Sequence, residues 1–331
     1  MRMLLPAASS PKGPTVTAMQ QHAPSTNPAR RGHQTDTSAQ RSLPTEPDRT
    51  VPVRDVDLRF EEVPKYFVAG DIVMSHLFAV LSATFPDGEE SFVRSVAAVR
   101  DRIDDDQLAE DVDGFVGQES MHGREHRAFN RHLAALGYPT RRVERYTEVA
   151  YRWFERGAGP KVHLAATAAL EHYTATLAEL LLTDSDARAV FEHDAVRRLF
   201  LWHALEESEH KAVAFDTFRH VGGTERMRRI TMTAVHLDFL LELVAMTAVS
   251  VALDGNARRH PTQVLRGLGR LLRSPFVSAG AIRQLAQYHR RGFHPNDRDT
   301  TGLVATWRLR LFGATPEPIT DPGRRVAGGS E

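Results

Sequence analysis

The chain has 331 residues, and its 42 basic and 42 acidic side chains give a formal net charge of zero. That balance offers no electrostatic footprint for nucleic acid, so we expect no nucleic-acid partner. The sequence contains no Cys, which excludes disulfides, iron–sulfur clusters, zinc thiolate sites and thiol nucleophiles.

Both ends of the chain differ in composition from its middle. Residues 1–54 are rich in Pro, Ser, Thr, Gln and Arg, so we predict a disordered tail there. The pair Leu4-Leu5 is too short for the apolar core of a secretory signal, and we expect a cytoplasmic protein. A gene start placed too early, with Met19 as the true start, and an Arg-bearing targeting peptide stay open as alternatives. A second disordered tail is predicted over residues 314–331, where Pro and Gly are frequent.

Between the tails apolar residues recur at helical spacing and no region alternates with period two, so the sequence predicts an all-α fold. A first helix is expected over Val68–Thr84. The run Pro86-Asp87-Gly88 is expected to end it and to start a second helix. One face of that second helix carries a carboxylate among apolar residues: Glu89, Phe92, Val96, Val99 and Ile103. A turn is expected near Ile103–Asp106.

The next helix shows the clearest pattern. Its apolar face advances in steps of three or four residues and includes three polar groups: Leu108, Val112, Phe115, Glu119, His122, His126, Phe129 and Leu133. A carboxylate buried without a partner is costly or becomes protonated, so this placement calls for a compensating cation. A metal ion is the simplest explanation.

A second pair of helices repeats the arrangement. A long connection over Leu136–Lys161, with a helix around Arg142–Glu155, leads to a face that again contains one carboxylate: Leu164, Ala168, Glu171, Ala175, Ala178 and Leu182. That helix is expected to end near Thr183. Asp194 is a plausible N-cap for the helix that carries Glu207-Ser-Glu-His210. The arms on either side of each turn are nearly equal, so all the glutamates return to a similar height at ~1.5 Å per residue.

The order along the chain is therefore Glu, Glu-x-x-His, Glu, Glu-x-x-His. This order is typical of a ferritin-like four-helix bundle that binds two divalent metal ions in its core. Four carboxylates and two imidazoles suit iron or manganese and offer zinc no thiolate. We expect the bundle over residues 55–222 and additional C-terminal helices, belonging to the same domain, over residues 223–313.

Within that C-terminal part, Ile230–Leu253 is the most apolar stretch and is long enough to cross a bilayer. Because it carries His236, Asp238 and Glu242, a buried or interface helix is favoured over a membrane span. A homodimer interface and a lid for an apolar substrate are the two roles considered. The following Arg-bearing segment, Val264–His289 with a break at Pro275, is interpreted as a solvated face, and peripheral membrane contact is not favoured.

Several motifs also resemble a known family. They are Phe85-Pro86-Asp87-Gly88-Glu89, Gly117-Gln118-Glu119-Ser120-Met121-His122-Gly123-Arg124-Glu125-His126, Trp202-His203-Ala204-Leu205-Glu206-Glu207-Ser208-Glu209-His210-Lys211 and Tyr288-His289-Arg290-Arg291-Gly292-Phe293-His294-Pro295. Together they resemble the bacterial family called "predicted metal-dependent hydrolase" over roughly residues 55–297. The resemblance implies metal ligands at Glu89, Glu119, His122, Glu171, Glu207 and His210. Glu90 and Glu206 leave the choice of carboxylate open by one position at two of these sites.

Two further histidines project toward the same cavity, since His126 lies four residues after His122 and His203 lies four before Glu207. Either could be an additional ligand, but orienting a ligand by a hydrogen bond is favoured for each. Glu125, Glu209 and His172 are displaced from the ligand faces by about 100° and are interpreted as surface or supporting groups.

For function, the sequence predicts a binuclear metal enzyme that acts on a small organic substrate. By analogy of fold alone, an oxygen-activating di-iron or manganese–iron oxidoreductase is favoured. A hydrolase, as the resembled family's name implies, is the alternative, and a non-enzymatic metal-binding bundle is the second alternative. No Ser-His-Asp order or Gly-rich phosphate loop supports a metal-free enzyme, and the catalytic residues are not identified.

Overall fold

The computed structural model describes residues 51–313, which lie within one compact unit. The predicted tails fall outside these residues, except for residues 51–54, which lie against a core helix and contribute to the site described below. Every regular element of residues 51–313 is helical, and a single isolated β-bridge joins Val68 to Phe191. The all-α prediction is confirmed.

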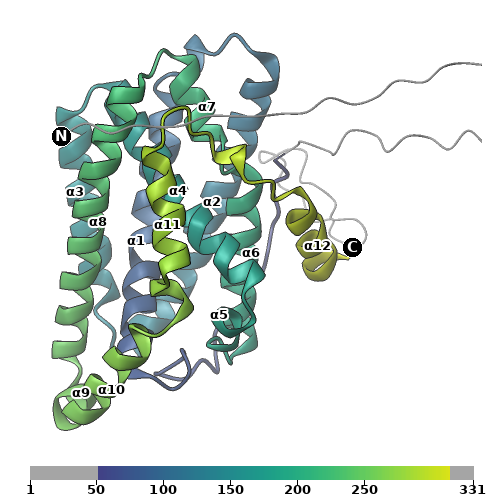
Figure 1. The fold of residues 1–331 in the computed structure, drawn as a ribbon. Helices are drawn as coiled ribbons and strands as arrows, with labels where there is room; N and C mark the ends of the chain where they lie inside the picture. The colour runs from purple at the N-terminus through teal and green to yellow at the C-terminus, as the bar shows by residue number, and fades with distance from the viewer. Residues whose placement is uncertain (1–50, 314–331) are drawn as a thin grey trace, which may run out of the picture. The chain divides into compact units, whose positions relative to one another are not determined.

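Four long helices form the core of the unit (Figure 1). They are α1 (Ile72–Ala97), α2 (Asp106–Ala135), α4 (Pro160–Thr183) and α6 (Asp194–His210). Helix α1 packs against α2, and α4 packs against α6, which gives the two hairpins that the spacing predicts. The connection between the hairpins contains α3 (Thr140–Gly157), which lies against α1.

Shorter and later elements surround this core. They are α5 (Ser185–Ala189), α7 (Val213–His220), α8 (Glu225–Leu253), α9 (Gly255–Arg259), α10 (Pro261–Leu271), α11 (Ala279–Ala286), α12 (Thr301–Phe312) and the 3-10 turns Arg100–Arg102, Pro275–Val277, Gln287–His289 and Pro295–Asp297. The turn at Pro275 confirms the expected break. Helix α6 begins at Asp194 itself, with His193 at the N-cap position, so the predicted cap is displaced by one residue.

The predicted helix break at Pro86 is wrong, because α1 runs through Pro86 without interruption. A proline inside a helix removes one N–H and leaves the carbonyl four residues earlier without its helical partner. Here that carbonyl belongs to Ser82, and the side-chain amide of Asn130 on α2 donates to it at 3.1 Å. The neighbouring helix therefore satisfies the group that the proline frees, and α1 continues to Glu89.

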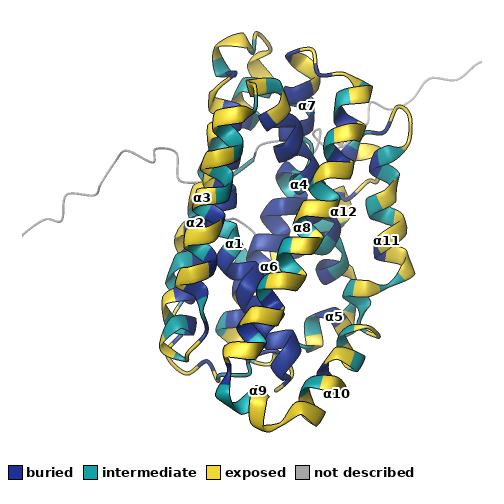
Figure 2. Cartoon of the chain, turned by 90° about the vertical axis from the view of Figure 1, so that its left-hand side faces the viewer, coloured by how far each residue is buried: buried dark blue, intermediate teal, exposed yellow. Residues whose placement is uncertain are grey.

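Helix α8 packs along α1 and α4 with one face and turns the other outward (Figure 2). Only 11% of its most apolar 18-residue window is buried. The expectation of a buried helix is therefore wrong, because the chain supplies no further element to cover α8 within residues 51–313. The expectation of an interface helix stays a prediction.

Candidate metal centre

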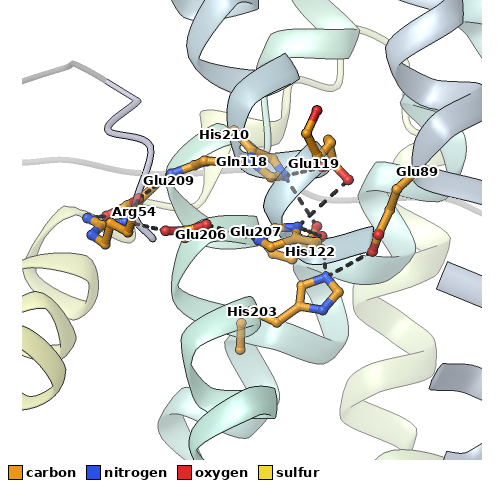
Figure 3. Close-up of polar contacts among 12 residues, drawn as sticks. Arg54, Glu89, Gln118, Glu119, His122, His203, Glu206, Glu207, Glu209 and His210 are labelled. Atoms are coloured by element: carbon orange, nitrogen blue, oxygen red, sulfur yellow. Dashed lines mark hydrogen bonds and ion pairs between the residues drawn. The ribbon is translucent and has the colours of Figure 1, made fainter. Parts of the chain in front are cut away.

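The six expected ligands converge in the middle of the four-helix core, and Figure 3 labels all of them except Glu171. Helices α1 and α4 each contribute one glutamate, and α2 and α6 each contribute a Glu-x-x-His pair: Glu89, Glu171, Glu119 with His122, and Glu207 with His210. None of the six is more than 3% exposed. The matched heights of the two hairpins thus place all six side chains in one buried cluster.

Two of the glutamates reach both imidazoles. His210 Nε2 lies 3.1 Å from Glu119 Oε1, 3.6 Å from Glu207 Oε2 and 3.3 Å from Glu171 Oε2. His122 Nδ1 lies 3.7 Å from Glu119 Oε2 and 3.9 Å from Glu207 Oε1. Glu119 and Glu207 therefore lie between the two histidines, which is the position of a bridging carboxylate in a two-ion site.

Each of the six residues also has buried polar atoms that lack a hydrogen-bond partner. These are both carboxylate oxygens of Glu89, Glu119 and Glu171, one oxygen of Glu207, His122 Nδ1 and His210 Nε2. Buried polar atoms in folded proteins are nearly always paired, so a cluster of unpaired ones calls for a ligand. Oxygen and imidazole donors fit divalent metal ions.

The donors also fall into sets that a metal ion can share. Within each set, one atom per residue lies within 4.8 Å of the others: Glu119, Glu171 and His210; Glu119, His122 and Glu207; and Glu89, His122 and His203. Two sets share Glu119 and two share His122. The residues present thus fit two neighbouring ions.

Without metal, protons must balance the charge of four buried carboxylates. Burial and the negative charge of Glu207 raise the pKa of Glu171 to about 8. Burial and the charge of Glu119 raise the pKa of Glu89 well above its usual range. Burial opposes protonation of His210, but the negative charge of Glu171 and the nearby carboxylates of Glu119 and Glu207 hold the pKa of His210 well above its usual range. The metal-free cluster therefore holds protons, and binding of divalent ions would release them.

The outward nitrogen of each ligand histidine is held by a polar side chain. His122 Nε2 donates to Glu206 at 3.1 Å, and His210 Nδ1 donates to the side-chain oxygen of Gln118 at 2.7 Å. Such bonds fix which nitrogen of an imidazole faces the metal. Glu206, the one-position alternative to Glu207, thus supports His122 from outside. Glu90, the alternative to Glu89, has a side chain that is 55% exposed and pairs with Arg94 and Arg127.

Both supports meet at Arg54. Its guanidinium donates to Glu206 at 2.8 Å and to both oxygens of Glu209 at 2.7 and 2.8 Å, and Gln118 donates to Glu209 at 2.8 Å. Arg54 is only 3% exposed although it lies in the segment predicted to be a tail. Glu209, interpreted from the sequence as a surface or supporting group, is a supporting one.

Two glycines of α2 leave room for residues 51–54, the segment that contains Arg54, to pack against the helix. A Cβ at Gly114 would lie 2.4 Å from the carbonyl oxygen of Val51, and one at Gly117 would lie 2.2 Å from Val53 Cγ2. Both separations are shorter than real Cβ contacts allow. Neither Arg54 nor Gln118 was predicted as a supporting residue from the sequence. The signal that could have found them is the pair of glycines three residues apart, since a glycine inside a helix usually has a packing reason.

The two additional histidines form a chain that leads away from the centre. Asn130 donates its amide to Ser82 O and Glu144, so its oxygen accepts from the Ser82 hydroxyl at 2.7 Å. Ser82 must then accept from His126 Nδ1 at 2.9 Å, and His126 Nε2 accepts from His203 Nδ1 at 2.8 Å. Burial and the neighbouring His203 lower the pKa of His126 well below its usual range, in keeping with this neutral form.

Because His203 Nδ1 donates to His126, its other nitrogen, Nε2, faces the carboxylates, 2.9 Å from Glu207 Oε1 and 3.6 Å from Glu89 Oε1. His203 therefore lies at the centre, and His126 lies one residue further out. Glu125 pairs with Arg124, and His172 contacts the carbonyl of Gln284, so neither takes part in the cluster.

The family comparison agrees with this geometry. A family model described as "predicted metal-dependent hydrolase" matches residues 52–299. The chain belongs to this family. Neither the curated proteins nor the solved structures compared with the chain contain a match. The family's description names hydrolysis, which was the alternative in the sequence analysis, and does not support the oxygen-activating chemistry that fold analogy favoured there.

Proposed function

We propose that this chain is a hydrolase that uses two divalent metal ions held by Glu89, Glu119, His122, Glu171, Glu207 and His210. The observation that carries the proposal is the set of unpaired oxygen and nitrogen atoms that these six buried residues direct at one another. Membership of a family described by metal dependence and hydrolysis supports the same function.

The donor set constrains the metal. Carboxylates with neutral imidazoles and no thiolate favour iron and manganese over a structural zinc site. When bound, such ions supply Lewis-acid activation of water and of a carbonyl or phosphoryl oxygen, and a redox-active pair can also supply electrons to dioxygen.

Residues of the chain provide the route for a proton. His203 Nε2 faces Glu207, and the hydrogen bonds continue from His203 Nδ1 through His126 to Ser82. The outer end of this chain is Asn130, which contacts the partly buried Glu144. His203 can take up a proton at Nε2 while its Nδ1 passes one to His126, and the route ends at Ser82 because the amide of Asn130 does not relay protons.

Aromatic side chains pack against the histidines of the centre and give it apolar surroundings. The ring of Phe85 lies 4.8 Å from both His126 and His203, and Trp202 lies 5.0 Å from His122. We propose a small substrate with an apolar part and a hydrolysable carbonyl bond, such as an ester or amide.

Oxygen activation is the second candidate, because the enclosure of the site is what a reaction of dioxygen also requires. No ligand is more than 3% exposed, and the shell contains no thiolate that dioxygen could oxidise. The family description does not favour this candidate.

One series of measurements separates the candidates. Elemental analysis of protein purified without added metal gives the native ions and their number. Manganese- or zinc-loaded protein that cleaves small esters or amides, with no spectral change when the iron-loaded protein meets oxygen, supports hydrolysis. A transient absorption band after oxygen is added to anaerobically iron-loaded protein, without ester or amide cleavage, supports oxidation. Two bound ions with neither activity would favour the non-enzymatic bundle.

A further inference from the structure

Helix α8 has an exposed, largely apolar face that the metal centre does not use, and Asp238 is the acidic residue exposed on it. It carries more of the large exposed apolar side chains than any other described helix: Ile230, Leu237, Leu240, Leu241, Val244, Val249 and Leu253. A helix this apolar is usually buried in a core, but only 11% of its most apolar window is buried. An exposed apolar surface of this length marks a contact with a partner or a membrane.

Unpaired arginines lie near both ends of α8. At its start, Arg226, Arg229 and Arg291 line an open hollow of about 610 Å³, together with His289 and with Glu225, whose carboxylate is paired with Arg228. Within residues 51–313 none of these three guanidinium groups makes a hydrogen bond or an ion pair, and Arg226 and Arg229 are exposed. An open hollow with three free guanidinium groups fits phosphate groups.

The far end of α8 has the same character. Arg258 and Arg259 on α9 and Arg266 on α10 are exposed and have no carboxylate partner among the described residues. Helix α10 adds exposed apolar side chains at Leu265 and Leu268. A basic, leucine-bearing helix of this kind is typical of segments that lie in a membrane interface.

A second copy of the chain fits these charges poorly. In an antiparallel α8 pair, Arg226 and Arg229 would meet the last residues of the partner helix, where the nearest acid, Asp254, is 5% exposed and engaged by His76, Tyr66 and Lys65. In a parallel pair the arginines would meet each other. A parallel pair would also bring up Glu225, but that carboxylate is already engaged by Arg228 at 2.9 Å and Arg219 at 3.7 Å. Neither arrangement gives the arginines a free carboxylate.

A membrane span is excluded by the packing of α8 on α1 and α4. Its 29 residues extend ~44 Å, beyond the ~30 Å hydrocarbon core, and suit a helix that lies along a surface. We propose that α8 docks lengthwise on an anionic phospholipid surface, with its apolar face in the interface and the arginines at its ends on lipid phosphates.

Vesicle flotation tests the proposal with phosphatidylcholine vesicles prepared with and without phosphatidylserine. The full chain is expected to bind the anionic vesicles and to be released by salt. The triple variant Arg226→Gln, Arg229→Gln, Arg291→Gln is expected to bind about 100-fold more weakly, at about fivefold for each arginine. Arg131→Gln, an exposed arginine on α2, is the matched control and should bind like the unaltered chain.

The apolar face is tested separately with Leu237→Ser and Leu241→Ser. These side chains are 66% and 71% exposed, so the variant is expected to fold, which circular dichroism checks. Loss of vesicle binding by this variant supports the proposal. Equal binding to neutral and anionic vesicles, or unchanged binding by the arginine variant, would overturn it. So would a stable dimer that does not bind vesicles and that Leu241→Asp dissociates.

Discussion

Arg54 donates to Glu206 at 2.8 Å although 152 positions separate the two residues in the sequence. Glu206 in turn holds His122, and the bond from Arg54 to Glu209 leads through Gln118 to His210. Both ligand histidines are therefore oriented from one buried guanidinium. The segment that begins at residue 51 belongs functionally to the centre, although none of its side chains faces the ligand oxygens.

Replacing Arg54 should weaken metal binding without removing any ligand. Arg54→Gln leaves Glu206 without its cation and Glu209 with Arg308 alone, so the supports of both histidines are weakened, and metal affinity should fall about 10–100-fold. Arg54→Lys keeps the charge but lacks the two-pronged geometry, and an intermediate loss is expected. Calorimetric titration with Mn²⁺ measures both.

Arg59→Gln is the matched control, because the side chain of Arg59 is 76% exposed and its ion pair within residues 51–313 is the 3.7 Å contact with the exposed Asp57. If Arg54→Gln folds and binds two ions with the affinity of the control, the orienting role of Arg54 is wrong.

Gly117→Ala should also weaken metal binding, because Gly117 lies on α2 against the segment that contains Arg54. The new Cβ would overlap Val53, so the chain segment must move and carry Arg54 with it. Metal affinity should fall by about tenfold, the lower end of the range for lost supporting bonds. Gly157→Ala is the control, since nothing lies within 4 Å of a Cβ there. Equal metal affinities for the two alanine variants would contradict the prediction.

Loss of a central glutamate should be more severe. Glu119 and Glu207 each reach both His122 and His210, so Glu119→Ala or Glu207→Ala removes charge shared by both ions. We expect binding of both ions to be abolished, as measured by elemental analysis after dialysis. Glu90→Gln, one residue from Glu89 but exposed, should retain both. Two ions per chain in both alanine variants, with unchanged affinity, would show that the centre lies elsewhere.

The ligand cluster was predictable because it depends on spacing within helices. A carboxylate in the apolar face of a helix can be recognised from the local sequence. Two hairpins with equal arms then bring four such carboxylates to the same height in the bundle. The continuous α1 was not predictable in the same way, since the partner of the Ser82 carbonyl is Asn130 on another helix. Arg54 was missed because its burial depends on carboxylates about 150 residues away, and the composition around it resembles that of a disordered segment.

His126 illustrates a case where sequence left two roles open. Its Nε2 accepts from His203 and its Nδ1 donates to Ser82, so no lone pair remains for a metal. His126→Ala should therefore retain both ions, with affinity lowered by about 10–100-fold at most. His203→Ala should lose more, because His203 Nε2 faces Glu207 directly. Metal titration of the two variants checks this order, and the reverse order would contradict the assignment.

The last prediction concerns pH and the metal-free protein. The folded-state pKa of Glu171 is about 8, well above its unfolded value, so the folded state holds this proton more tightly. Its contribution to stability is complete below about pH 4.5 and is lost as pH rises to about 8. Within that window this one group lowers the free energy of unfolding by up to ~1.4 kcal/mol per pH unit.

Glu171→Gln keeps the neutral shape and removes the titration. Urea unfolding in the presence of a chelator should therefore show a shallower loss of stability between pH 5 and pH 8 than in the unaltered chain. Glu90→Gln, at an exposed position, should leave the slope unchanged. Saturating Mn²⁺ should also flatten the slope of the unaltered chain, because bound metal takes the place of the proton. A metal-free protein whose stability increases steadily from pH 5 to pH 8, with no difference between Glu171→Gln and the unaltered chain, would show that Glu171 is not protonated in the cluster.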